Sequence, residues 1–317
     1  MIILGGFTRL TGSGLSITEW NVFTGILPPL NHADWQILFA KYQLIPEFKI
    51  VNFDMNVEDF KRIFWLEYLH RILGRIIGLV TIFGFIFFIR DKNISVSMKK
   101  KIAFITFFIP VQGLIGWYMV KSGLKDNVDV SHFMLAFHLT MAFILLFLLA
   151  RFYHDAKFPN TKLVTKNYSK FVKFIIVIAF IQVVFGAFVA GLKAGLIYNE
   201  FPMMGDGFLP LEIYDHRFFS FAYINNPAIV QFIHRITAYL LSILIIILGV
   251  KFYKEFDLKI KKQYKLVIYT LLLQIIVGIT VLLTSLNIYL AVIHQLIAAI
   301  LIYILSWFYI SILRTKA

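Results

Sequence analysis

The sequence contains no cysteine among its 317 residues, and this absence excludes several kinds of chemistry. The chain has no disulfide framework, no iron-sulfur cluster, no thiolate-ligated haem and no covalently attached c-type haem, because each of these requires cysteine sulfur. A cysteine nucleophile is excluded for the same reason. Any metal or redox centre in this protein therefore depends on its eight histidines.

Charged residues are also scarce, at 15% of the chain against about 25% in soluble domains. Apolar residues make up 60% of the chain, and the mean hydropathy is +0.80. A water-soluble enzyme of this composition would expose too much apolar surface, and a disordered chain requires the opposite balance. The sequence therefore predicts an all-α membrane protein with several membrane-spanning helices.

Seven long apolar runs are each close to the ~20 residues that a helix needs to cross a bilayer. The chain also opens with a short apolar stretch from Met1 to Phe7, which we interpret as the last turns of an eighth helix whose beginning is missing. This start has neither the basic region nor the full apolar region of a signal peptide. The seven complete spans are expected at residues 64–89, 102–120, 133–150, 171–192, 229–250, 266–285 and 288–312.

Lys and Arg are concentrated in alternate loops, at residues 90–101, 151–173 and 251–265. The positive-inside rule places these three loops in the cytoplasm. The intervening loops, including residues 10–63 and 193–228, are more acidic and are expected to face outward. Because the basic residues lie in short loops between apolar runs, the net charge of +14 does not indicate a nucleic-acid partner.

The two halves of the chain repeat the same residue types in the same order. Chance matching among apolar segments would not keep Gly, Pro, Gln and His in matching order, so we predict a parallel duplication of two four-helix bundles. Residues 1–160 form the first half and residues 161–317 the second. The repeated residues include Gly5 and Gly186, Pro29 and Pro210, His70 and His234, Gln112 and Gln274, Gly116 and Gly278, and His138 and His294.

Four histidines lie within the apolar spans, namely His70, His138, His234 and His294. Each is near the start of a helix that enters from the outer side, so all four are expected within about two turns of that surface. Two imidazoles in each half can then face each other across a bundle, as bis-histidine ligation of a haem iron requires. A zinc site would need a third or fourth donor. A single histidine of this kind is equally compatible with a packing role.

The halves differ at one position that bears on chemistry. Glu67 precedes His70 by three residues, whereas Gln231 holds the equivalent place before His234. A carboxylate at membrane depth is costly unless it is paired or used. An ion pair with Arg71 is the structural interpretation. In the functional interpretation, the charge stabilises a cationic intermediate or takes a proton beside a haem edge, which assigns the reaction to the first half and a fixed redox site to the second.

Other polar residues in the spans have two interpretations each. Arg71 and Arg235 directly follow their histidines and can reach outward to a porphyrin propionate, although ordinary snorkelling explains either one alone. The Gln-x-x-x-Gly pattern, which begins at Gln112, Gln182 and Gln274, is expected to serve close helix packing rather than ligand contact. The remaining histidines, expected to be solvated or interfacial, are His32, His132, His154 and His216.

Six segments of the chain resemble those of the haem A synthase family, over essentially its whole length. The Glu-x-x-His-Arg element, together with three further histidines on helices, is the most specific part of the resemblance. Two departures are the shortened first helix and the lack of a cysteine pair that some members carry in the first outer loop, which indicates the cysteine-free proteobacterial and mitochondrial-type branch. The segments are residues 5–16 (GGFTRLTGSGLS), 67–71 (EYLHR), 112–124 (QGLIGWYMVKSGL), 135–139 (LAFHL), 199–204 (NEFPMM) and 231–235 (QFIHR).

The resemblance implies an eight-helix enzyme of the cell inner membrane that oxidises the C8 methyl of haem O to the formyl of haem A and so supplies cytochrome oxidase. The steps are two hydroxylations with oxygen from water, followed by dehydration of a geminal diol. By this resemblance, His234 and His294 hold a haem b. His70 and His138 are assigned to the substrate haem, and Glu67 is the catalytic carboxylate. The candidate partners are a haem O synthase, a membrane electron acceptor such as a quinone, and a second copy of the chain.

Two other classes of protein share part of this pattern. A dihaem b-type electron carrier explains the four histidines and the duplication, but it gives no role to the difference between Glu67 and Gln231. A transporter explains the repeat and the long outer loops, but it leaves the paired histidines without a role. The bound pigment distinguishes the three classes. A transporter purifies colourless, a carrier holds only haem b, and the synthase also carries haem of the O or A type.

Overall fold

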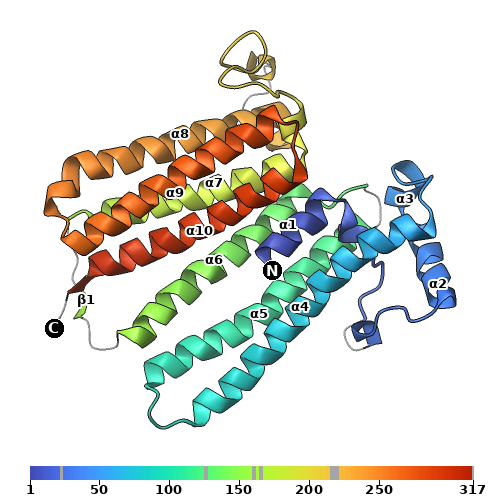
Figure 1. Ribbon diagram of the computed structural model, residues 1–317, viewed down its shortest axis with the longest axis horizontal. Helices are drawn as coiled ribbons and strands as arrows, with labels where there is room; N and C mark the ends of the chain where they lie inside the picture. Colours follow the sequence, from blue (N-terminus) through green and yellow to red (C-terminus); the bar gives the residue numbers. More distant parts are fainter. Residues whose placement is uncertain (22–23, 125–127, 159–161, 164–166, 215–220, 316–317) are drawn as a thin grey trace. The chain divides into compact units, whose positions relative to one another are not determined.

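The computed structural model describes residues 1–21, 24–124, 128–158, 162–163, 167–214 and 221–315, and seven helices in these ranges are long and apolar enough to cross a membrane. Each covers most of one predicted run, so the prediction of an all-α membrane protein with several spans is confirmed. The helices are α4 (Val57–Arg90), α5 (Val96–Gly123), α6 (His132–Lys157), α7 (Ser169–Gly191), α8 (Pro227–Phe252), α9 (Leu258–Leu283) and α10 (Ile288–Leu313) (Figure 1).

The eighth span expected at the start of the chain is not confirmed. Helix α1 (Ile2–Leu10) has nine residues, which at 1.5 Å per residue reach ~14 Å, about half of the bilayer's hydrocarbon thickness. The remaining elements are short. They are α2 (His32–Tyr42), α3 (Pro46–Ile50), the 3₁₀ turns η1 (Ser13–Leu15), η2 (Thr24–Ile26), η3 (Ala194–Leu196), η4 (Leu211–Tyr214), η5 (Phe221–Asn225) and η6 (Tyr253–Glu255), and the antiparallel strands β1 (Lys162–Leu163) and β2 (Arg314–Thr315).

Polar caps explain where several long helices begin. The side chain of Asn56 accepts hydrogen bonds from two backbone N–H groups in the first turn of α4, and Asn226 does the same for α8. Ser95 and Asp257 each cap one N–H at the starts of α5 and α9. These N–H groups have no partner within the helix, so a side-chain acceptor stabilises the helix start.

Contacts divide the chain into two compact units, Met1–His138 and Leu139–Ala317. The division lies inside α6. The boundary predicted between residues 160 and 161 is a different division, because it separates the two duplicated sets of helices in the sequence. It stays a prediction. Each unit contains one intramembrane histidine pair from α4 and α6 or from α8 and α10.

In the first unit, α2 and α3 pack against the first turns of α4. We use the word cap for α2, α3 and the first turns of α4. Its core is largely aromatic; the Trp35 and Phe64 rings, for example, meet edge to face with centroids 5.0 Å apart. Because Phe60 and Phe64 belong to α4, the cap is fixed to the helix that carries Glu67. The buried core residues are Leu15, Trp35, Phe39, Tyr42, Ile45, Phe60 and Phe64.

In the second unit, α7 packs on α8 and α10, and α9 packs on α10. Several hydrogen bonds join helices in this unit, and two of them lie far from the histidines. Ser306 on α10 donates to the backbone oxygen of Phe147 on α6, and Gln263 on α9 donates to Ser311 on α10. Such interhelical bonds supply part of the association energy where lipid offers no hydrophobic contrast between helices.

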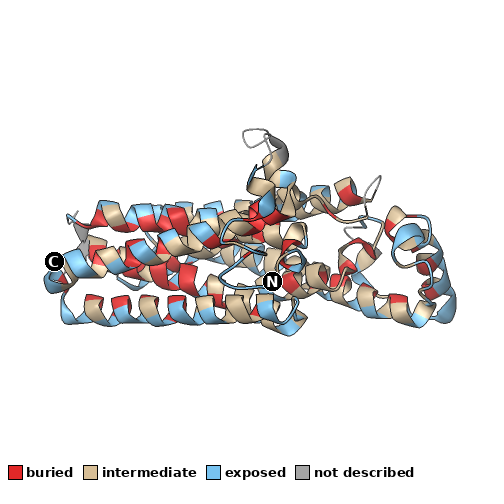
Figure 2. Cartoon of the chain, turned by 90° about the horizontal axis from the view of Figure 1, so that it is seen from above, coloured by how far each residue is buried: buried red, intermediate tan, exposed pale blue. Residues whose placement is uncertain are grey.

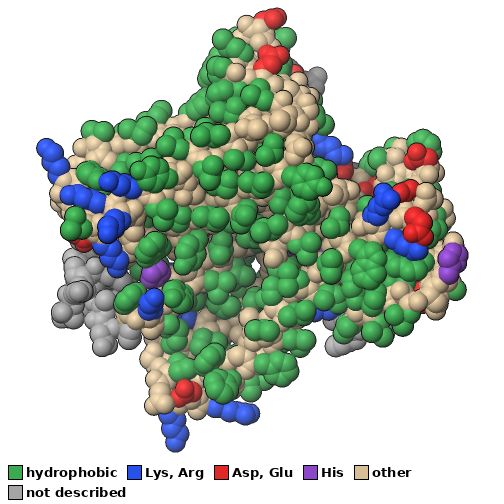
Figure 3. Space-filling model, viewed as in Figure 1, with side chains coloured by type: hydrophobic (Ala, Val, Ile, Leu, Met, Phe, Trp, Pro, Cys, Tyr) green, Lys and Arg blue, Asp and Glu red, His purple; other side chains and the backbone are tan. Residues whose placement is uncertain are grey.

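The surfaces of the long helices suit a lipid environment. Most of their residues are intermediate or exposed (Figure 2), and the most apolar stretch of α4 has no buried residue. Figure 3 shows apolar side chains along α8 and α9, with Lys and Arg at the end where these two helices connect. Exposed apolar surface of this extent is stable in contact with acyl chains rather than water.

Candidate functional site

The four intramembrane histidines share one local arrangement. Each imidazole lies against a glycine on a helix packed beside its own, and a methyl group added at that glycine would come to within 2.6–3.2 Å of a ring atom. Glycine at these positions lets the ring pack closely, since a Cβ would require the ring or the backbone to shift, most of all at Gly278. The pairs are Gly5 with His70, Gly116 with His138, Gly186 with His234, and Gly278 with His294.

Three of the four histidines are also bonded to a glutamine one turn before that glycine. The amide nitrogen Nε2 of Gln112 lies 3.2 Å from Nδ1 of His138, and Nε2 of Gln182 lies 3.1 Å from Nδ1 of His234. Nε2 of Gln274 lies 3.1 Å from Nε2 of the fourth imidazole, that of His294. The expectation for the Gln-x-x-x-Gly pattern was therefore incomplete. The glycine gives close packing, and the glutamine orients the imidazole.

The donors fit axial ligation of a haem iron better than a metal cluster. His70 and His138 belong to one unit, and His234 and His294 belong to the other. No group of three or more His, Asp or Glu side chains that could hold a metal ion occurs among the described residues. The buried Nδ1 of His294 has no hydrogen-bond partner in the part of the chain that the structure describes. Two imidazoles in each unit match the donor set of a bis-histidine haem.

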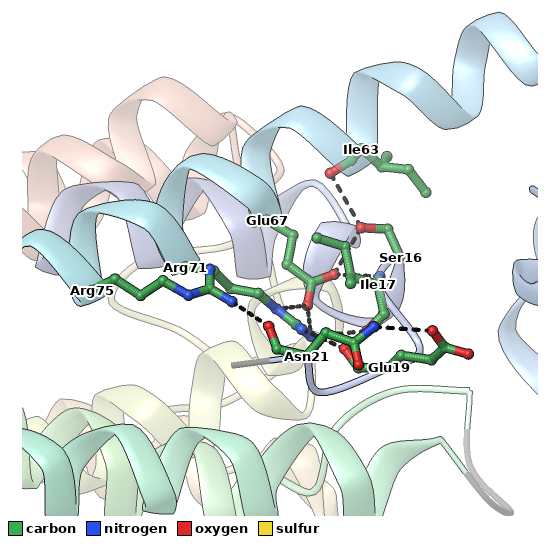
Figure 4. Close-up of polar contacts among 8 residues, drawn as sticks. All are labelled: Ser16, Ile17, Glu19, Asn21, Ile63, Glu67, Arg71 and Arg75. Carbon is green, nitrogen blue, oxygen red and sulfur yellow. Dashed lines mark hydrogen bonds and ion pairs between the residues drawn. The ribbon is translucent and has the colours of Figure 1, made fainter. Parts of the chain in front are cut away.

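Glu67 is buried at 3% exposure and is fully engaged by donors (Figure 4). Its Oε1 atom pairs with Arg71, at 2.6 Å from Nη2 and 3.0 Å from Nε. Its Oε2 atom accepts from the hydroxyl of Ser16 at 2.7 Å and from the backbone N–H of Ile17 at 2.8 Å. The predicted ion pair is confirmed. Ser16 and Ile17 were missed by the sequence analysis, although Ser16 is the last residue of a segment that carried the resemblance.

The two arginines hold the same part of the chain in each unit. Arg71 donates to the backbone oxygens of Ile17 and Glu19, at 2.8 and 2.9 Å. Arg235 donates to those of Tyr198 and Glu200, at 3.4 and 2.8 Å. Ile17 and Tyr198 are 181 residues apart, and so are Glu19 and Glu200, which is the offset of the sequence repeat in this region. The repeat is therefore present in the hydrogen bonds. Each guanidinium group binds the segment that follows η1 or η3, residues 16–21 and 197–202, which we call the outer segment of each unit because the sequence predicts that it faces outward.

Gln231 donates a hydrogen bond where its counterpart Glu67 accepts one. Its amide donates to the backbone oxygen of Tyr198 at 2.8 Å, whereas Glu67 accepts from the backbone N–H of Ile17. Both residues thus bind the equivalent outer segment. Only the first unit has a negative charge at this place, so the sequence difference corresponds to a difference in charge beside His70 and His234.

A cavity of about 280 Å³ opens beside the Arg71 side of this network. Its wall includes Ser16, Ile17, Arg71 and Arg75, together with residues of the outer segment and of α2. The guanidinium of Arg75 donates to the backbone oxygen of Asn21 at 2.9 Å (Figure 4). Arg71 and the partners of Glu67, Ser16 and Ile17, therefore border an opening on the cap side of α4 that has both polar and apolar walls.

The other histidines differ from one another. His32 starts α2 on the exposed surface, and His132 starts α6. His154 is buried at 8% exposure and stacks on Trp307, so the expectation that it is solvated or interfacial is wrong. His216 lies outside the described residues. An aromatic ring buried against another gains apolar contact, which explains the position of His154 without a ligand role.

Comparisons with known proteins match nearly the whole chain. A family model described as cytochrome oxidase assembly protein (COX15-CtaA) matches residues 1–306. The haem A synthase of Rickettsia felis is 44% identical over 98% of this chain and 94% of its own length. The haem A synthase of Pelagibacter ubique is 43% identical over 93% of this chain and 87% of its own. That of Rickettsia prowazekii is 42% identical over 98% of this chain and 92% of its own.

Proposed function

Since the chain belongs to the cytochrome oxidase assembly protein family (COX15-CtaA), we infer that it is a haem A synthase of the membrane. The observation that carries this inference is its 42–44% identity to haem A synthases over nearly its full length. The reaction is the oxidation of the C8 methyl of haem O to a formyl group. It proceeds through two hydroxylations with oxygen from water and the loss of one water.

His234 and His294 are the residues that would hold a haem b. Both imidazoles belong to the second unit, and each is positioned by a glycine and a glutamine of a neighbouring helix. Such second-layer contacts orient an imidazole toward its metal. A bound haem b supplies one-electron transfer. The protein itself contributes the ligand geometry and an apolar surrounding that excludes water.

His70 and His138 are the residues that would bind the substrate haem O in the first unit. Glu67 lies one turn from His70 and keeps a negative charge at a defined place, because Arg71, Ser16 and Ile17 hold both of its oxygens. A fixed charge stabilises a developing cation without reorganisation of its surroundings. The same carboxylate is a proton acceptor within the site. Arg71 and Arg235 are proposed to place the haem propionates near the outer segments that they bind.

The proposal extends to location and partners. The three basic loops, at residues 90–101, 151–173 and 251–265, lie in the cytoplasm, and the cap lies on the opposite side of the cell inner membrane. Residues 159–161 and 164–166 of the second loop lie outside the described residues. The electrons pass to a membrane acceptor of the quinone class. A haem O synthase delivers the substrate, and a second copy of the chain is a candidate partner.

The test is conversion of haem O to haem A in membranes, together with the pigment of the purified protein. Membranes are prepared from cells that lack their own haem A synthase and express a haem O synthase, with and without this chain. We expect haem A only with the chain present, and we expect the purified protein to hold haem b together with haem O or A. A preparation that contains only haem b and makes no haem A would instead support the dihaem electron carrier, and a colourless preparation would support the transporter.

A further inference from the structure

Buried polar side chains of the first unit are concentrated at one place. Among its described residues, the buried polar or charged side chains all lie near the end of α1, in or directly after η1, in α3 or at Glu67 on α4. The rest of the cap core is apolar and largely aromatic. Buried polar groups destabilise a core unless they are satisfied or used. The set consists of Thr8, Ser13, Ser16, Glu47 and Glu67.

Two buried carboxyl groups lie on either side of the same short segment, residues 12–17. Glu67 binds its end through Ser16 and Ile17. Glu47 lies at its beginning, where the backbone of Gly12 adopts a left-handed conformation (φ +66°) and a Cβ would come to 3.7 Å from Oε1 of Glu47. Ser13, between them, is fully buried, and its hydroxyl lies 2.6 Å from that of Thr11. Hydroxyl groups therefore line the segment that separates the two carboxyl groups.

Glu47 itself is only partly satisfied. It is 5% exposed, and its Oε2 atom has no hydrogen-bond partner among the described residues. Burial raises the pKa of its carboxyl to about 8, and the charges of Asp129 and Glu67 raise the pKa further. The hydroxyl of Tyr42 on α2 and the guanidinium of Arg9 on α1 act in the opposite direction. Glu47 can therefore gain or lose a proton near neutral pH.

On the side of Glu47 away from residues 12–17, polar side chains lie between Glu47 and the surface of the cap. The Tyr42 hydroxyl lowers the pKa of the Glu47 carboxyl, and it accepts a hydrogen bond from the amide of Asn52 at 2.7 Å. Asn52 is followed by the exposed residues Phe53 and Asp54. Polar groups thus run from Glu67 through the segment 12–17 to Glu47 and then to solvent.

From this arrangement we infer that Glu47 is a proton-relay residue, which takes protons released at the Glu67 site and passes them through Tyr42 to solvent at the cap. The inference rests on the proposed function. Conversion of a methyl to a formyl group with one water releases four protons and four electrons. The electrons go to the membrane acceptor named above. The protons leave separately from the electrons, and each transfer at Glu47 only makes and breaks an O–H bond.

The main test compares Glu47→Gln with Glu58→Gln. Glu58 is a matched control, because it is also a carboxylate of the cap but has a side-chain exposure of 75%. We expect Glu47→Gln to lower the rate of haem A formation at least about tenfold, with a larger solvent isotope effect and unchanged haem content, because relay of protons is part of general acid–base catalysis. Glu47→Asp, which restores a carboxyl group, should recover part of the rate. Tyr42→Phe should slow the reaction by a smaller factor.

Two measurements do not depend on turnover. Infrared spectra of the wild type should show a protonated carboxyl band that titrates near pH 8 and is absent from Glu47→Gln. The stability of the wild type should also fall between about pH 4.5 and 8, because the unfolded chain releases this proton at lower pH than the folded one. Glu47→Gln should lack this part of the fall, whereas Glu58→Gln should keep it.

The outcomes separate the relay from the proposed function. If the wild type makes no haem A, the proposed function fails, and the infrared and stability measurements alone decide whether Glu47 exchanges protons. If the wild type makes haem A and Glu47→Gln matches it in rate, pH profile and isotope effect, the relay is overturned. A loss of rate that Glu47→Asp does not recover, without the infrared band in the wild type, also overturns it, since a packing defect then accounts for the loss.

Discussion

Glu67 and Gln231 occupy equivalent positions in the two units but form opposite hydrogen bonds to the outer segment. Glu67 accepts from Ile17, and Gln231 donates to Tyr198. Neither position is exposed, so solvation does not explain the choice of residue. The charge at Glu67 is kept by Arg71, and removing one partner of a buried ion pair leaves the other uncompensated. Single residues therefore decide which unit has the chemistry of an acid or base.

The first prediction at this scale concerns Glu67→Gln. The variant keeps the size of the side chain but loses the negative charge, so we expect the rate of haem A formation to fall by ~10² or more, as for loss of a preorganised electrostatic group. The haem b content should stay normal. The measurement is the ratio of haem A to haem O in membranes that also contain a haem O synthase. A ratio near that of the wild type would reduce Glu67 to a structural partner of Arg71.

The second prediction concerns the glycine that faces His294. In Gly278→Ala the new methyl would lie 2.6 Å from Cε1 of the imidazole, and overpacking of this kind costs about 1–3 kcal/mol. We expect a lower haem b content and a lower melting temperature in detergent. Gly113→Ala is the control, because a Cβ there has no neighbour within 4 Å. Equal haem content in the two variants would show that the imidazole moves away from Gly278 when the haem binds.

Pairs of helices are the units that position the imidazoles. For three of the four histidines, a glutamine and a glycine one turn apart on one helix face the imidazole on the next, as in α7 with α8 and α9 with α10. In α7 with α8 the glutamine has a further partner, since the Thr237 hydroxyl bonds to Gln182. The same spacing recurs because one helical turn places both side chains on one face. Met1 stands four residues before Gly5, where the other three helices have glutamine.

A prediction at this scale follows for the glutamines of the second unit. Gln182→Leu or Gln274→Leu should change the absorption and electron paramagnetic resonance spectra of haem b and shift its reduction potential, because a bond to the second imidazole nitrogen orients the ligand. The control is Gln263→Leu, at a buried glutamine of α9 that bonds Ser311 instead of a histidine. Spectra that change equally in all three variants would indicate a general packing effect.

The whole molecule combines two units of related structure with different tasks. The equivalent bonds from Arg71 and Arg235 to the outer segments show that duplication preserved the frame. The cap and Glu67 belong to the first unit alone. A duplicated frame lets one unit keep a fixed redox group while the other binds and releases a substrate of the same shape. This division of tasks is part of the proposed function.

The prediction for the whole molecule tests this division with four variants. His234→Ala or His294→Ala should remove haem b, because a low-spin haem that loses one axial imidazole is weakly held. His70→Ala or His138→Ala should leave the haem b spectrum largely intact while abolishing haem A formation. Optical spectra and pigment extraction from the purified variants make the comparison. Equal loss of haem b in all four variants would contradict the assignment of substrate and cofactor to different units.

The sequence by itself determined the class of fold, the seven long spans and the repeat, because hydropathy and residue spacing are local properties of the chain. It also identified Glu67, Arg71 and the four intramembrane histidines as candidates. A polar or ionisable residue within a membrane span costs free energy, so its presence indicates a pairing or functional role. The spacing of Glu67 and Arg71 was sufficient to predict their ion pair, because i,i+4 neighbours meet on any helix.

Only the tertiary structure decided which partners lie around these residues. Ser16 and Ile17 reach Glu67 from about 50 residues away along the chain, and Tyr42 reaches Glu47 from a different helix. The contact of each glutamine with its histidine depends on the angle and register of two packed helices, which spacing within one helix does not specify. The burial of His154 against Trp307 depends on packing in the same way. Long-range contacts such as these arise from packing, and packing is a property of the folded chain.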